Sequence, residues 1–291
     1  MEGTLKNYLQ EDEFWTIRIN EMTKKLPGPL IFCLFLLLAL AGLESQAAGS
    51  GAERGIPVLV YHRFGPEVSD GMTVTTPVFE SHLKYLQENG YRVIPLRGLL
   101  DNYLKNGVPP DSRLVAMSAD DAHISVYRNA LPLIKKYRIP MTLFIYPSAV
   151  SNASYAMTWD QLRELKTTGL FDFQSHTYWH PNFKKEKKKL KPEEYQKLVD
   201  MQLVKSKNFL EKKLGTKVDL LAWPFGIYDD ELEKDAAKAG YVVAFSIDRR
   251  LDSKSEPMMA QPRYLMVNSD GVKGFAAIVE GKVQEKGHKT Y

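Results

Sequence analysis

Only one cysteine, Cys33, occurs among the 291 residues. A single cysteine excludes an intramolecular disulfide framework and a cysteine-rich metal site, so any metal centre must use other ligands. Long apolar runs are scarce as well. The run at residues 30–43 is shorter than the roughly 20 residues that a membrane-spanning helix needs. No strong excess of one charge exists, because 39 Lys and Arg stand against 35 Asp and Glu.

The basic residues are dispersed, apart from a lysine-rich run at residues 184–191. Such a run is more typical of a solvated loop or helix face than of a nucleic-acid surface, so we predict no nucleic-acid partner. The content of 44% hydrophobic and 25% charged residues is that of a globular chain with a sizeable core.

The N-terminal region has the pattern of a secretory signal. Two lysines at residues 24–25 precede the apolar run, and small residues Ser45 and Ala47 follow it. This order predicts a signal peptide at residues 1–47, cleaved after Ala47, and a linker at residues 48–55. Residues 1–21 are acidic, whereas Met22 begins a more typical signal, so we infer that Met22 is the true start. The folded part is then exported to the periplasm, the cell surface or the medium. The alternative is an uncleaved segment that associates with the membrane.

Residues 56–281 alternate between strand and helix patterns. Strands are expected at residues 56–62, 91–94, 113–118, 140–146, 171–175, 219–223, 241–247 and 264–267, and helices at 76–88, 126–137, 158–168, 192–214, 229–239 and 271–280. Alternation favours parallel strands with helices outside. Seven or eight such units predict an α/β fold with a closed or nearly closed β/α barrel, forming one catalytic domain over residues 56–291.

Polar residues follow several of these strands, at the end of a barrel where active sites lie. Asp120 and Asp121 end one apolar strand, and His176 and His180 follow another. Two histidines four apart on one face of a helical turn, together with Asp121, predict a three-ligand metal site with a position open for water. The second carboxylate would then serve as general base. The alternative is a pair of structural histidines and a helix-capping loop carboxylate.

These residues resemble the polysaccharide deacetylase family, carbohydrate esterase family 4. Residues 118–122 (SADDA) are similar to its S/T-F-D-D-G motif, and residues 176–181 (HTYWHP) to its H-S/T-x-x-x-H motif. Residues 223–226 (WPFG) are similar to a Pro-Tyr-Gly segment of the family, with Phe225 in place of Tyr. Residues 57–62 (PVLVYH) and 262–264 (PRY) resemble the circularly permuted subgroup of exported poly-β-1,6-N-acetylglucosamine deacetylases.

The resemblance implies a distorted (β/α)7-type barrel and metal-dependent removal of N-acetyl groups from an N-acetylglucosamine-containing polysaccharide. It makes Asp120 the general base towards metal-bound water and His62 the acid that protonates the amine. Asp121, His176 and His180 become the ligands of a divalent metal. We expect Zn²⁺, with Ni²⁺ or Co²⁺ as alternatives.

The resemblance also assigns residues around this centre. The Phe225 backbone N–H, in the segment that includes Pro224, would stabilise the oxyanion. Arg263 would orient Asp120. Tyr178 and Trp179 would stack on sugar rings, although packing at the rim is the alternative for each.

Two alanines depart from the family motif. Ala119 replaces Phe, and Ala122 carries a Cβ where Gly allows an unusual backbone angle. Other functions remain open at this point. The same site would serve an O-acetyl esterase acting on a polysaccharide such as xylan, or a catalytically silent carbohydrate-binding relative.

Overall fold

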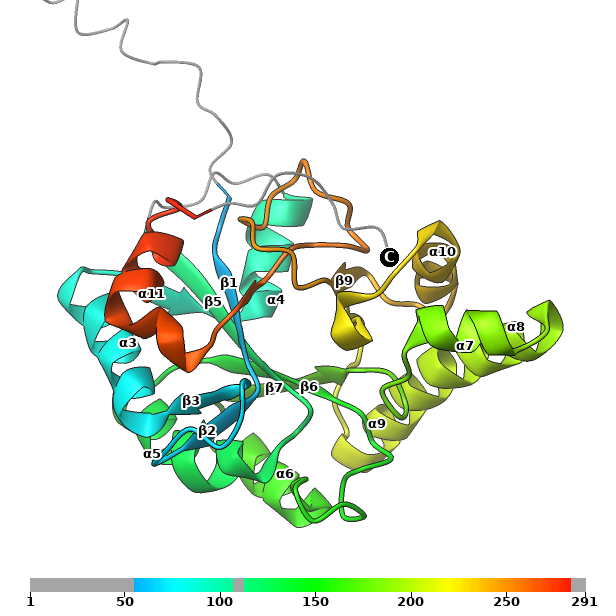
Figure 1. The fold of residues 1–291 in the computed structure, drawn as a ribbon, viewed down its shortest axis with the longest axis horizontal. Helices are drawn as coiled ribbons and strands as arrows, with labels where there is room; N and C mark the ends of the chain where they lie inside the picture. The colour runs from blue at the N-terminus through cyan, green and yellow to red at the C-terminus, as the bar shows by residue number, and fades with distance from the viewer. Residues whose placement is uncertain (1–54, 107–112, 284–291) are drawn as a thin grey trace, which may run out of the picture. The chain divides into compact units, whose positions relative to one another are not determined.

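A parallel sheet surrounded by helices makes up the part of the chain that this computed structural model describes, residues 55–106 and 113–283 (Figure 1). The predicted signal segment, with Cys33, Ala47 and Met22, lies outside the described residues. No helix in these two ranges combines the length and the apolarity needed to cross a membrane.

Eight parallel strands form the main sheet. Seven follow one another in the order β10-β1-β5-β6-β7-β8-β9, and β4 pairs beside β5. Their bounds are β1 Val58–Tyr61, β4 Arg92–Ile94, β5 Leu114–Asp120, β6 Met141–Ile145, β7 Phe171–Ser175, β8 Leu220–Ala222, β9 Val243–Phe245 and β10 Tyr264–Leu265. β1 and β6 are buried along their whole length, as apolar strands covered on both faces should be.

Helices lie around these strands (Figure 1). Their bounds are α3 Thr76–Glu88, α4 Leu96–Leu99, η2 Leu100–Lys105, η3 Val126–Ala130, α5 Leu131–Tyr137, α6 Trp159–Thr167, α7 Phe183–Lys189, α8 Pro192–Asp200, η4 Met201–Lys205, α9 Ser206–Leu214, η5 Pro224–Gly226, α10 Asp230–Lys238, η6 Asn268–Asp270 and α11 Gly271–Val279. Thr158 caps α6, because its side chain accepts from the N–H of Gln161 in a capping box.

The predicted distorted (β/α)7-type barrel is confirmed as a single α/β domain with a curled, incompletely closed sheet. β9 and the segment entering β10 meet through the isolated bridge between Phe245 and Gln261. Strand register places the ends of β1, β5, β6 and β7 at a common rim, because Tyr61 pairs with Ala119 and Ile145 with Ser175.

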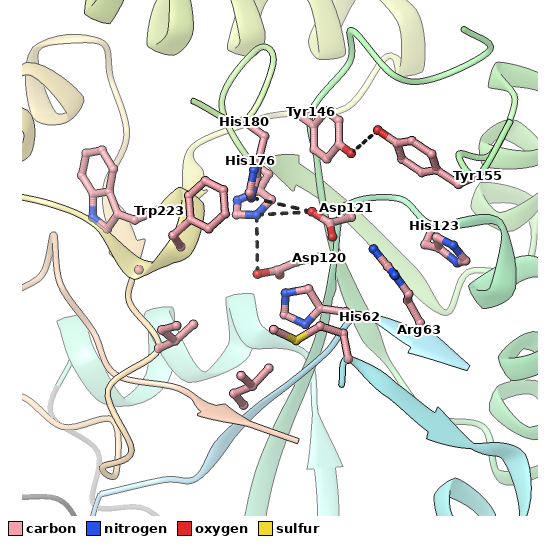
Figure 2. A pocket seen from close by; sticks show the side chains of 15 residues that line it. His62, Arg63, Asp120, Asp121, His123, Tyr146, Tyr155, His176, His180 and Trp223 are labelled. Atoms are coloured by element: carbon pink, nitrogen blue, oxygen red, sulfur yellow. Dashed lines mark hydrogen bonds and ion pairs between the residues drawn. The ribbon is translucent and has the colours of Figure 1, made fainter. Parts of the chain in front are cut away.

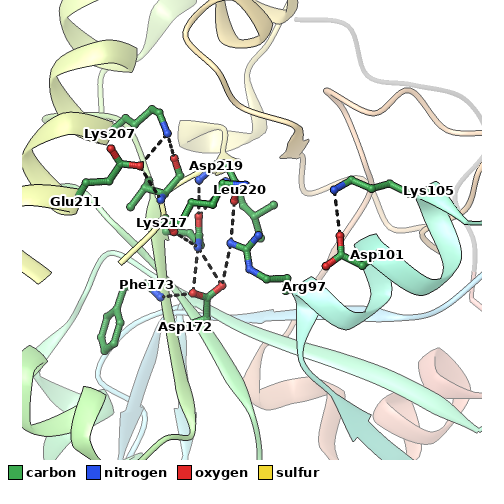
Figure 3. A network of polar contacts seen from close by, with 12 residues as sticks. Arg97, Asp101, Lys105, Asp172, Phe173, Lys207, Glu211, Lys217, Asp219 and Leu220 are labelled. Atoms are coloured by element: carbon green, nitrogen blue, oxygen red, sulfur yellow. Dashed lines mark hydrogen bonds and ion pairs between the residues drawn. The ribbon is translucent and has the colours of Figure 1, made fainter. Parts of the chain in front are cut away.

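The opposite end of the sheet is closed by side chains (Figure 3). β7 and β8 share only the pair Ser175 and Leu221, so their backbones contribute little pairing. The Gln174 side chain replaces part of the backbone pairing between these two strands. Its Oε1 accepts from the N–H groups of Asp219 and Leu220. Arg97 of α4 donates to the Asp219 carboxylate at 2.8 Å. This network holds the start of β8 against β7, away from the rim that carries the candidate site residues.

Several short elements were not assigned from the sequence patterns. A short helical stretch, α4 with η2, follows β4. Strands β2 Arg63–Gly65 and β3 Thr73–Thr75 form a small parallel sheet of their own. Residues 184–189 of the lysine-rich run lie in helix α7, which begins after the Asn182 cap and agrees with the solvated helix face that was one of the two expected forms. Each is short enough that its apolar pattern covers too few residues to stand out.

Candidate metal and catalytic site

The two carboxylates lie where β5 ends. Asp120 is the last residue of β5 and is almost fully buried. The chain then takes two left-handed residues, Asp121 with φ 73° and Ala122 with φ 53°. This turn explains how neighbours that would point apart in a strand both face one site. The expectation that position 122 has a glycine-like backbone angle is confirmed, and Ala122 accommodates it with a Cβ.

His176 and His180 lie on the loop after β7. Their predicted arrangement on a helical turn is wrong, because the loop is irregular and has positive φ at Thr177 (65°) and His180 (64°). The side chain of Gln202 holds this loop, since its Oε1 accepts from the N–H groups of Tyr178 and Trp179. The two imidazoles still converge, with ring centroids 4.6 Å apart.

Asp121, His176 and His180 form a cluster of donor atoms (Figure 2). The Oδ1 atom of Asp121 lies 3.7 Å from His176 Nε2 and 3.8 Å from His180 Nε2. Both separations are below twice a metal–ligand bond of about 2.0–2.2 Å, so one ion can contact both partners of each pair. One carboxylate and two imidazoles are also a donor set typical of zinc. The residues present therefore fit a divalent metal.

Both imidazoles are prepared to act as ligands. Nδ1 of His176 donates to the carbonyl oxygen of Ala222 at 2.8 Å, which leaves the lone pair of Nε2 facing Asp121. Burial, followed by the nearby charge of His176, lowers the pKa of His180 to about 4. His180 is consequently neutral at pH 7, the form that binds metals.

Asp120 is paired with Arg263, which precedes β10. The guanidinium donates from Nη1 to Oδ1 and from Nη2 to Oδ2, each at 2.8 Å. Burial by itself would raise the pKa of Asp120, but Arg263 and the neighbouring histidines outweigh it and lower the pKa to about 2. Asp120 is therefore a carboxylate at pH 7. Its Oδ2 also lies 3.8 Å from His176 Nε2, beside the donor cluster.

His62 follows β1 and lies next to Asp120 in Figure 2. Its Nδ1 is buried without a hydrogen-bond partner in the described part of the chain. Burial lowers the pKa of His62, while Asp120 and Asp121 oppose that shift. An imidazole with an uncommitted nitrogen in a cleft is a candidate for proton transfer.

These groups open into one cavity of about 510 Å³. Its lining consists of His62, Arg63, Met72, Asp120, Asp121, His123, Tyr146, Tyr155, His176, His180, Trp223, Phe225, Gly226, Ile247 and Leu265. The predicted acid, the predicted base and the three predicted ligands therefore all line the same cavity.

Only some of the residues predicted to bind substrate line the cavity. Phe225 lines the cavity, with its ring 4.5 Å from that of His180, whereas Pro224 is buried and does not belong to the lining. Tyr178 and Trp179 do not belong to this cavity lining. Tyr178 instead lies beside Lys205, whose Nζ is 4.2 Å from the ring centroid, and Trp179 is 42% exposed. Sugar stacking on these two rings stays a prediction, away from this cavity.

Arg63 and His123 line the cavity but were not singled out from the sequence. Arg63 directly follows His62, and His123 comes two residues after Asp121. Their positions just beyond strand ends were a usable signal, since side chains at that rim face the site.

Fold and site together define a β/α-barrel protein with a carboxylate–imidazole donor cluster in a cavity at the rim. A family model described as "Polysaccharide deacetylase" matches residues 107–244. This match assigns residues 107–244 to the polysaccharide deacetylase family.

Individual relatives agree with that assignment. The "Poly-beta-1,6-N-acetyl-D-glucosamine N-deacetylase" of Staphylococcus aureus (strain MRSA252) is 29% identical over 198 residues, 67% of this chain and 68% of the relative. The structure of IcaB from Ammonifex degensii has a TM-score of 0.66 at 25% identity, covering 78% of this chain and 97% of that one. The Streptococcus pyogenes deacetylase PplD in complex with acetate has a TM-score of 0.70 at 22% identity, over 78% and 99%. This last likeness concerns the fold.

Proposed function

We propose that the protein is an exported, metal-dependent hydrolase that removes N-acetyl groups from an N-acetylglucosamine-containing polysaccharide. The observation that carries the proposal is the meeting of Asp120, His62 and the donor cluster in one cavity. Family membership and the name of the Staphylococcus aureus relative support the class of substrate.

Asp121, His176 and His180 would hold the metal. When bound, a divalent ion supplies Lewis acidity, which polarises the acetyl carbonyl and makes water more acidic. We propose Zn²⁺ on the basis of the donor set, with Ni²⁺ and Co²⁺ as alternatives.

Asp120 and His62 divide the proton transfers. Asp120, held as a carboxylate by Arg263, takes a proton from the attacking water as its oxygen bonds to the acetyl carbon. His62 donates a proton to the nitrogen as the carbon–nitrogen bond breaks. The products are acetate and a free amine. The backbone N–H of Phe225 stabilises the negative charge that develops on the acetyl oxygen.

The test is a product assay on an N-acetylglucosamine oligomer with Zn²⁺, Ni²⁺ or Co²⁺ added. Equal amounts of acetate and free amine are expected, whereas acetate without amine from an acetylated xylan indicates an O-acetyl esterase. Asp120→Asn and His62→Ala should lose at least about a hundredfold in rate. Acetate release by Asp120→Asn at the wild-type rate would contradict the assignment, and no release by any preparation would indicate a binding protein.

Export rests on the sequence of residues 1–47 alone. N-terminal sequencing of the protein from its native host tests it. A mature chain beginning at Ala48 is expected, and an intact segment would indicate a membrane-associated form.

A further inference from the structure

The cavity is lined by two unlike groups of side chains, and in Figure 2 Trp223 lies on one side of the donor cluster while Arg63 and His123 lie on the other. The apolar group consists of Trp223, Phe225, Ile247 and Leu265. The polar group, which we call the polar wall, consists of Arg63, His123, Tyr146 and Tyr155. A volume of about 510 Å³ far exceeds an acetyl group and is typical of cavities that take a larger ligand. The polar wall is therefore available to the rest of the substrate.

Arg63 is fixed in the polar wall by the small sheet of β2 and β3. Its backbone N–H donates to the carbonyl of Met72 at 3.3 Å, and its Nη1 is paired with the Asp70 carboxylate. Asp70 is itself held, because its Oδ1 accepts from the Met72 N–H at 2.9 Å and from the Thr73 hydroxyl at 3.0 Å. The guanidinium is thus positioned before any ligand arrives.

Arg63 keeps unused donor capacity. A guanidinium carries five N–H donors, and Asp70 engages only Nη1. Nε of Arg63 is buried without an acceptor in the described part of the chain. Because Nε is buried, the donors that a ligand can reach are the N–H groups of Nη1 and Nη2 that Asp70 does not engage. The side chain is 37% exposed, which leaves it accessible from the cavity.

The surrounding charges decide what kind of oxygen fits. Asp70 already balances the charge of Arg63, so the guanidinium offers a ligand hydrogen-bond donors without a net positive charge. The hydroxyl oxygens of a neutral ligand fit such donors.

The rest of the polar wall has the same neutral, amphipathic character. The rings of His123 and Tyr155 are stacked, 6.2 Å apart and 13° from parallel. Tyr155 is 44% exposed, and its hydroxyl lies 2.8 Å from that of Tyr146. Aromatic rings with polar tips suit a ligand that carries both C–H faces and hydroxyls.

We propose that Arg63 is a specificity-determining residue that donates hydrogen bonds to hydroxyl oxygens of a neutral sugar unit next to the acetyl group being removed. The inference rests on the proposed function, since it names the part of the glycan that the same site recognises. Arg63 binds substrate and transition state alike, so it acts on KM more than on kcat.

Arg63→Lys tests this, because lysine keeps the charge that pairs with Asp70 but lacks the planar donor fork. KM for an N-acetylglucosamine pentamer should rise about fivefold to tenfold, with kcat nearly unchanged. Cleavage of a small aryl acetate, which has no sugar, should stay within about twofold. The matched control is Arg163→Lys on α6, where the arginine pairs with Asp160 outside the cavity.

Two kinetic outcomes overturn the proposal: an unchanged KM for the pentamer, or equal losses on both substrates, which would place the effect in the catalytic centre. Failure of the wild type to release acetate would instead contradict the proposed function. Calorimetric binding of the pentamer then still decides the role of Arg63. Weaker binding by Arg63→Lys supports it, and equal dissociation constants overturn it. Should Arg63→Lys unfold, Asp70→Asn, which releases the guanidinium, is compared in the same assays and is expected to raise KM for the pentamer alone.

Discussion

Arg263 binds both oxygens of Asp120, through two hydrogen bonds of 2.8 Å between side chains that are almost fully buried. Nε of Arg263 donates to the carbonyl oxygen of Ser246 at 3.0 Å, and Nη1 lies 3.2 Å from the Ser118 hydroxyl. The guanidinium is also flanked by the rings of Phe144 and Phe245. The carboxylate is consequently fixed in orientation and in charge by one residue that is itself held on every side.

Removing one member of this pair should be costly. Arg263→Gln leaves Asp120 as a buried, uncompensated carboxylate, so the free energy of unfolding should fall by about 3–5 kcal/mol. Urea unfolding followed by circular dichroism measures the loss. The double variant Asp120→Asn with Arg263→Gln removes both charges and should lose less than the sum of the single variants. A change below about 1 kcal/mol in Arg263→Gln would show that the pair does not act in this way.

The donor cluster should govern metal content. Asp121→Asn and His180→Ala each remove a ligand, so metal affinity should fall more than tenfold. Metal analysis after dialysis against a weak chelator checks this, and acetate release should fall in parallel. Trp179→Ala is the control for metal content, because Trp179 lies on the same loop as His180 but outside the cavity lining. A full complement of metal in Asp121→Asn would exclude that carboxylate as a ligand.

The left-handed backbone angle at Ala122 should lower the free energy of unfolding. A side chain in that region costs about 1–2 kcal/mol, which glycine avoids. Ala122→Gly should therefore be about 1–2 kcal/mol less destabilising than Ala130→Gly, its matched control. Ala130 is equally buried but has an ordinary φ of −84°. Chemical unfolding of the two variants gives the comparison, and equal losses would mean that no strain is relieved.

His82 should make stability depend on pH. Its ring is buried and stacks on Phe275 at 4.2 Å, and burial lowers its pKa to about 4, against 6.5 when unperturbed. Between these values the unfolded chain binds more protons than the folded one, so the free energy of unfolding falls as pH falls. The full contribution is present above pH 6.5, and about 3 kcal/mol of it is lost by pH 4.

His82→Gln isolates this contribution from that of the other histidines. Unfolding free energies measured from pH 7 to 4.5 should fall more steeply in the wild type than in the variant. Parallel curves for the two proteins would refute the assignment to His82.

Much of the barrel could be predicted because its strands are continuous apolar runs with clear stops. β7 begins and ends where it was expected, at Phe171 and Ser175. The left-handed residues Thr177 and His180 could not be foreseen, since side-chain patterns carry no information about the sign of φ in a loop. These positive φ angles are the reason that the segment from His176 to His180 is an irregular loop and not the expected helical turn.

The central residues of the site were easier to predict from the sequence than the residues that line the rest of the cavity. Parallel strands in order bring His62, Asp121 and His176 to one rim, and the resemblance pairs Arg263 with Asp120, as the structure does. Their catalytic roles stay predictions. Of the polar wall, the position of Arg63 was the hardest to predict, because Arg63 belongs to the small sheet of β2 and β3, whose strands are only three residues long.

Asp120 and Arg263 lie 143 positions apart in the sequence, which has a consequence for how the protein matures. A chain made from its N-terminus acquires the carboxylate long before its counter-charge. Any product that ends before Arg263 therefore has a carboxylate in its core that this arginine does not balance, and its barrel lacks β10. Formation of the last strand and pairing of the base are thus coupled, so a fragment that ends before Arg263 lacks both.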